Sequence, residues 1–182
     1  MVTIWIVIIT LGFSAFFSGM EIAFVSSNRL KQELDMKRNI YSARLLSEFY
    51  NNPSRFIGAL LLGNNVALVI YGMATAAWLE PVIRQHLPVA LQSEFIVLLT
   101  QTILSTLLIL IVAEFLPKIF FRLNPNAILK SLALPVWVLY YLLYPLIFIY
   151  IGVAEFILQK IFRVKINEET YSFSAFDLDE YV

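Results

Sequence analysis

The chain has 182 residues, of which 60% are hydrophobic and only 14% are charged, whereas about a quarter are charged in an average soluble domain. Its 13 basic and 13 acidic residues give a formal net charge of zero, so it offers no overall basic surface for nucleic acid. It contains no cysteine, which excludes disulfides and thiolate metal sites. This composition predicts an all-α membrane protein.

Four uncharged stretches follow one another along the chain, at residues 1–20, 56–79, 95–113 and 131–154. Each is near or above the roughly 18–20 residues that cross a hydrocarbon core. The first has no basic residue ahead of its apolar run and no small-residue cleavage pattern, so we interpret it as a retained helix rather than a signal peptide. We predict transmembrane helices at about 2–25, 56–80 and 94–121.

The distribution of Lys and Arg orients these helices. Six basic residues lie between the first two, Arg84 alone lies between the second and third, and three more gather around the end of the third. Because cytoplasmic loops collect Lys and Arg, we predict an N-terminus outside and a C-terminus in the cytoplasm, with a bacterial inner membrane as the expected bilayer. The connector at 30–49 has apolar residues at roughly helical spacing, which predicts a helix there.

The fourth stretch departs from this pattern. It contains Pro135 and Pro145, which are costly inside a straight helix, and its Trp and Tyr residues resemble interfacial anchors. We predict a belt of juxtamembrane helices over about 128–162, with two short helices hinged near Pro145, and keep a fourth span as the alternative. Residues 167–182 have five acidic residues and no basic one, which predicts an acidic linker towards a further domain, after a transmembrane ion-transport domain at 1–166.

Polar residues inside the three predicted spans are candidate functional groups, because they are costly at membrane depth. The candidates on the first, second and third helices are Thr10, Ser14, Ser18 and Glu21; Gly63, Asn64 and Asn65; and Glu114. The four on the first helix fall on one stripe. At a rise of about 1.5 Å per residue, Ser14, Ser18, Asn64 and Glu114 share one layer, roughly 10–16 Å from the cytoplasmic ends of their helices.

The oxygen atoms of this layer suit a hard cation. Hydroxyl, amide and carboxylate oxygens favour Mg²⁺, Ca²⁺ or Na⁺ over zinc or copper. We predict as metal ligands Ser14, Ser18, Asn64 and Glu114, with Gly19, Glu21, Gly63 and Asn65 as further candidates. Pro117 removes a backbone hydrogen bond and so frees a carbonyl near residue 113, which would line the same cavity.

Structural interpretations of the same residues remain open. Ser14 and Ser18 also form a small-x-x-x-small helix contact, and the asparagines could bond across helices. Glu114 could pair with Lys118 one turn away. The spans carry no Ser–His pair, Asp pair or His–Glu motif, so we predict no catalytic residue and do not expect an enzyme.

Three motifs occur in order along the chain: Ser14-Ala-Phe-Phe-Ser18-Gly19-Met-Glu21, Leu62-Gly63-Asn64-Asn65 and Glu114-Phe-Leu-Pro117-Lys118. Together they resemble the transmembrane domain of the cyclin M/CorC family of magnesium transporters. The resemblance implies three spans, a juxtamembrane belt, an inward-facing cavity and a homodimer. It also implies Mg²⁺ export driven by Na⁺ entry, and it matches Ser14, Ser18, Asn64 and Glu114 to the family's ion ligands.

In that family, cytosolic CBS modules that bind adenine nucleotides usually follow this domain, so a nucleotide would bind only through a domain absent from this chain. The chain departs from many relatives at Met20, Leu68 and Ala113, where they often carry Ser, Asn and Gly. We therefore expect a Mg²⁺ transporter whose partners are the lipid bilayer, a second copy of the chain, and Mg²⁺ and Na⁺ ions. A non-transporting membrane module that senses Mg²⁺ or regulates another transporter is the alternative.

Overall fold

The computed structural model describes residues 2–160, and within this range the chain is helical apart from short turns and has no strand. Four helices in this range are long and apolar enough to cross a membrane. The prediction of an all-α membrane protein is confirmed. The predicted linker at 167–182 lies outside the described residues.

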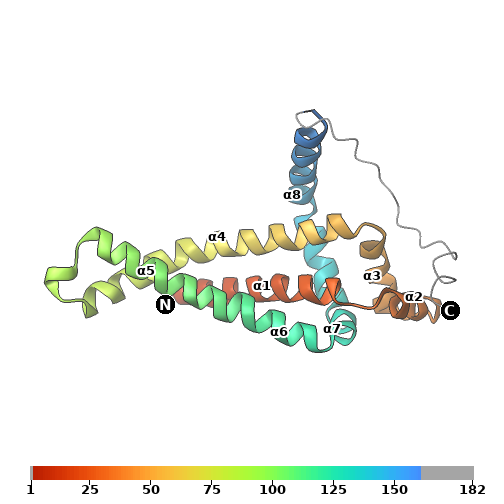
Figure 1. Cartoon of the computed structure of the whole chain (residues 1–182), viewed down its shortest axis with the longest axis horizontal. Coiled ribbons are helices and arrows are strands. Elements are labelled where there is room, and N and C mark those ends of the chain that lie inside the picture. Colours follow the sequence, from red (N-terminus) through yellow and green to blue (C-terminus); the bar gives the residue numbers. More distant parts are fainter. Residues whose placement is uncertain (1, 161–182) are drawn as a thin grey trace, which may run out of the picture.

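Three long helical rods run side by side and form a bundle (Figure 1). The first is α1, Val2–Val25, and the second is α4, Pro53–His86. The third is continuous from Glu94 to Leu123 and consists of α5 (Glu94–Leu108), the π-helix η2 (Ile109–Phe115) and α6 (Leu116–Leu123). The second rod is longer than predicted at both ends, because Pro53 occupies a first-turn position that suits proline and the helix continues through Pro81.

Short helices gather at one end of the bundle, beyond the end of α1 and the start of α4 (Figure 1). They are α2 (Arg29–Lys37), α3 (Tyr41–Asn51) and α7 (Pro125–Ser131). We call this the inner end, because the sequence predicts that it faces the cytoplasm, and the opposite end, with η1 (Val89–Leu91), the outer end. The prediction of a single connector helix at 30–49 is wrong: the chain turns at Asn39, whose φ of 57° is left-handed and well tolerated by asparagine.

The main hydrophobic core lies at the inner end. Phe49 of α3 stacks on Phe56 of α4 with ring centroids 4.1 Å apart, and Phe24 of α1 meets Phe56 edge-on at 4.7 Å. Leu129 of α7 is fully buried in the same core. Elsewhere the rods carry many exposed large apolar side chains, the kind of surface that suits a lipid environment.

The last described helix, α8 (Ala133–Lys160), runs across the bundle rather than along it (Figure 1). It packs on α3 and α4 and buries Val136 and Tyr140 in the inner core. The prediction of two short helices hinged near Pro145 is wrong, because one helix continues through this proline. The direction of α8 favours the predicted juxtamembrane belt. Since Ala133–Tyr150 is also apolar and long enough to span, the number of spans stays a prediction.

The absence of cysteine from the sequence allows the topology to be tested with single cysteines at Lys37, Arg84 and Lys160. We expect only the cysteine at residue 84 to react with a membrane-impermeant thiol reagent added outside intact cells, because it alone lies at the outer end. Reaction at residue 160 would contradict the juxtamembrane interpretation, since a fourth span would place the end of α8 outside.

Candidate ion-binding site

A polar contact joins α1 and α4 at the predicted layer. The Ser14 hydroxyl donates a hydrogen bond of 2.5 Å to Asn64 Oδ1. Ser14 is fully buried and Asn64 is half-buried. Oxygens from two helices are thus adjacent, as the shared depth predicts, and both keep a free lone pair. This is also the cross-helix bond that a purely structural interpretation expects, so the role of these residues as ligands stays a prediction.

Ser18, one turn nearer the inner end, is a buried polar residue on the same stripe of α1 as Ser14. Its side chain is 2% exposed, and its Oγ has no hydrogen-bond partner in the described part of the chain. Thr10, on the same stripe, donates to its own helix at the carbonyl of Ile6, 2.7 Å away, as helical hydroxyls commonly do. Because buried polar groups are nearly always bonded, the free Ser18 oxygen suggests a ligand.

Two glycines let the rods approach closely around these serines. A Cβ built on Gly63 of α4 would lie 2.6 Å from the ring of Phe17 on α1, and one built on Gly19 would lie 2.7 Å from the ring of Phe121 on α6. Real Cβ atoms essentially never come this close to other heavy atoms. Glycine at these two positions therefore allows α1 to pack closely against α4 and α6. The role of Gly19 and Gly63 as backbone ligands stays a prediction.

Replacing Gly63 by Ala is expected to destabilise the folded protein by about 1–3 kcal/mol, the usual cost of overpacking, because the added Cβ would clash with the buried Phe17 ring. Gly58 on the same helix is the matched control, since an added Cβ meets nothing there within 4 Å. Gly58→Ala should be neutral or slightly stabilising. Thermal unfolding of both variants in detergent tests this, and equal stabilities would contradict the close approach.

Glu114 lies in a π-helix. The segment η2 has i→i−5 bonding, seen where the Leu116 N–H bonds to the Ile111 carbonyl. Pro117 follows directly and is buried; it has no N–H to donate, and its ring opposes the carbonyl one turn earlier, so a wider turn accommodates it. π-segments are rare and often occur at functional sites. The sequence predicted a freed carbonyl here from Pro117 but missed the π geometry.

Glu114 does not pair with Lys118. Among the described residues, the ion pairs are Glu80 with Arg84 and Asp35 with Lys130. Glu114 is half-buried, and its segment packs against α1, the helix that carries both serines. The structure therefore does not support the alternative interpretation, in which Glu114 forms a local ion pair with Lys118.

Comparison with protein families identifies the chain. Residues 5–182 match the model of the CNNM family, described as the cyclin M transmembrane N-terminal domain. The chain belongs to the CNNM family. This match covers nearly the whole chain and confirms the resemblance seen in the three motifs. A comparison with curated proteins gives no match.

The charge of the CNNM candidate site is low. The four predicted ligands supply one carboxylate and three neutral oxygens. No group of three or more His, Asp or Glu residues that could hold a metal lies together in residues 2–160. Glu21, a further candidate three residues beyond Ser18, is half-buried, whereas Asn65 is exposed. The roles of Glu21 and Asn65 as ligands stay predictions.

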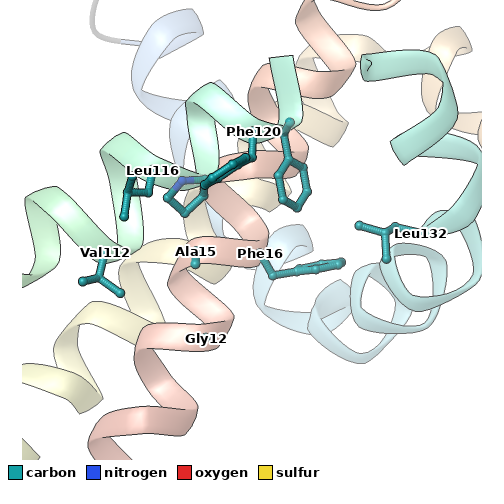
Figure 2. Close-up of a pocket in the computed structure, with 9 residues that line it drawn as sticks. Gly12, Ala15, Phe16, Val112, Leu116, Phe120 and Leu132 are labelled. Atoms are coloured by element: carbon teal, nitrogen blue, oxygen red, sulfur yellow. The ribbon is translucent and has the colours of Figure 1, made fainter. Parts of the chain in front are cut away.

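An apolar groove of about 500 Å³ lies beside the site, between α1 and the third rod. Figure 2 shows Gly12, Ala15 and Phe16 of α1 facing Val112, Leu116 and Phe120. None of the four predicted ligands lines it. The apolar side chains that line the groove suit hydrocarbon rather than an ion. The candidate ion site of this CNNM domain is therefore the polar contact between Ser14 and Asn64, and not this groove.

Proposed function

We propose that this CNNM domain exports Mg²⁺ through a site formed by Ser14, Ser18, Asn64 and Glu114, with Na⁺ entry as the driving force. The observation that carries the proposal is the buried Ser18 hydroxyl without a partner, one turn from the Ser14–Asn64 bond. Membership of the CNNM family supports metal transport as the general activity. In the proposed orientation the inner end faces the cytoplasm of a bacterial cell.

The proposed ligand set suits an ion that must be released. Mg²⁺ prefers six oxygen ligands and gives up water reluctantly, so it usually keeps several waters and takes one or two carboxylates. Two hydroxyls, one amide oxygen and Glu114 complete only part of that shell. Because a single carboxylate leaves the occupied site with a net positive charge, we expect weak binding, which a transport cycle needs.

A second candidate function is a non-transporting module that senses Mg²⁺ or regulates another transporter. The observation that favours it is the inner core, where α3, α7 and α8 pack on the ends of α1 and α4. Through such a core, a conformational change at the ion site could reach a neighbouring protein. In this case the site would bind Mg²⁺ without releasing it across the bilayer.

Efflux of Mg²⁺ from loaded proteoliposomes separates the two functions. We expect release above that of protein-free liposomes, and faster release when Na⁺ is added outside. A protein that binds Mg²⁺ in a calorimetric titration but releases none would instead be a sensor. Release that ignores the Na⁺ gradient would contradict the coupling but not the transport.

We also propose that the domain works as a homodimer. Three rods give little protein around a polar site, and the third rod is largely exposed, so a symmetric partner would shield it from lipid. We expect light scattering of the detergent-solubilised protein to give the mass of two chains. A monomer at working concentration would count against this arrangement.

A further inference from the structure

Outward of the Ser14–Asn64 contact, the three rods close around one aromatic ring. Tyr71 lies two turns further along α4 than Asn64, and its side chain is 1% exposed. It packs with Val7 of α1, and Ile109 of η2 lies against the same cluster. At about 1.5 Å per residue, the ring sits roughly 10 Å outward of Asn64. All three rods therefore meet at Tyr71, between the candidate ion site and the outer end.

The hydroxyl of Tyr71 ties α4 to the third rod. It donates a hydrogen bond of 3.2 Å to the Ser105 carbonyl in the last turn of α5. The same carbonyl accepts the N–H of Ile109, the residue at which η2 begins. Because η2 carries Glu114, the ring is anchored at the turn that leads into the ion site. A movement of η2 would strain or break this hydrogen bond.

A second buried hydroxyl lies beyond the ring. Thr75, one turn outward of Tyr71, is 3% exposed, and its hydroxyl lies beside the Tyr71 hydroxyl. Asn64, Tyr71 and Thr75 stand at i, i+7 and i+11, which places them on one face of α4. Thr10 of α1 is buried between the levels of Ser14 and the ring. Polar groups thus continue on both sides of Tyr71, along the same face as the site.

We propose that Tyr71 is the outer gate of the ion path. The ring blocks passage outward from Ser14 and Asn64, and the path opens towards Thr75 when the hydroxyl leaves the Ser105 carbonyl. This inference rests on the proposed function, because it gives that site its outward exit. A single neutral hydrogen bond contributes little net stability, so it can hold the gate closed and still release it.

Thiol accessibility tests the gate without relying on transport. In a Thr10→Cys protein, the only cysteine lies inward of the ring. We expect an impermeant thiol reagent added outside to react slowly with it when Tyr71 is present. Tyr71→Phe keeps the ring and removes the hydroxyl, and should speed the reaction about two- to tenfold, the ratio expected for one net hydrogen bond. Tyr71→Ala removes the ring and should speed it further.

An Arg84→Cys protein is the control, because residue 84 is at the outer end and should react equally fast with or without the Tyr71 substitutions. Unchanged reaction at Thr10→Cys in both Tyr71 variants, with the control intact, would overturn the gate. Phe behaving as Tyr would show that the ring only packs, and would overturn it as well. The labelling could change as expected while the unmodified protein releases no Mg²⁺ from liposomes. That result would support Tyr71 as a barrier but contradict the proposed export of Mg²⁺.

Discussion

Glu114→Gln is expected to reduce Mg²⁺ efflux from loaded proteoliposomes by about 10- to 100-fold or more, because even partners outside the first coordination shell cost this much at metal sites. The substitution keeps the size of the side chain and one carbonyl oxygen. It removes the only formal negative charge of the predicted ligand set. Since Glu114 pairs with no cation among the described residues, we expect little change in the folded structure, which thermal unfolding would show.

Lys118→Met is the matched control for this variant. If Glu114 acted through a helical pair with Lys118, the two substitutions would break the same contact and behave alike, each costing only a few tenths of a kcal/mol. The structure has no such pair, and Lys118 is exposed. We therefore expect Lys118→Met to transport nearly as the unmodified protein does. Equal and mild losses in both variants would remove Glu114 from the site.

Lys130→Met is expected to lower the free energy of unfolding by ~3 kcal/mol, at the lower end of the range for breaking a buried ion pair. Lys130 of α7 pairs with Asp35 of α2, whose side chain is only 7% exposed, while that of Lys130 is 28% exposed. Removing the ammonium leaves a buried carboxylate without compensation. This pair links the connector after the first rod to the helix that follows the third.

Two comparisons make this prediction sharp. Adding Asp35→Asn to Lys130→Met removes the stranded charge, so the double variant should recover much of the lost stability. Arg84→Met breaks the exposed Glu80–Arg84 pair, whose side chains are 49% and 38% exposed, and should cost no more than about 1 kcal/mol. Thermal unfolding of the four proteins in detergent decides it. A loss after Lys130→Met as small as that after Arg84→Met would show that the buried pair adds nothing.

Much of the bundle could be predicted from the sequence, because helix rise is fixed and charges mark where apolar runs end. Counting from those boundaries placed Ser14 and Asn64 at one depth, and the structure joins them by a hydrogen bond. Family membership followed from the same residues, since the motifs contain the polar groups that lipid-facing helices exclude. The roles of these residues as ligands remain predictions.

Other features had no adequate signal in the sequence. The π-helix around Glu114 lies in an almost uniformly apolar run, where a change in helical period leaves no mark, and Pro117 alone indicates a kink as readily as a wider turn. The direction of α8 depends on packing through Tyr140 and Val136, which an apolar pattern on all sides does not reveal. Asp35 and Lys130 lie far apart in the chain and meet only through the tertiary fold.

Tyr71 and Thr75 were missed for a different reason. They follow Asn64 at helical spacing and could have been added to the polar face of the second helix. In an apolar run, however, a single Tyr or Thr is usually a packing residue. Only the burial of both side chains and the hydrogen bond from Tyr71 to the third rod distinguish them from their apolar neighbours.

Locating a bound metal is the most direct test of the proposed site. Mn²⁺ takes the same oxygen ligands as Mg²⁺ and scatters X-rays anomalously, so crystals of the protein grown with Mn²⁺ should show where the ion binds. We predict one anomalous peak within ligand distance of Ser14, Ser18, Asn64 and Glu114, and its loss in Glu114→Gln. A peak elsewhere, such as beside Glu21 alone, or a peak that persists unchanged in the variant, would contradict the site.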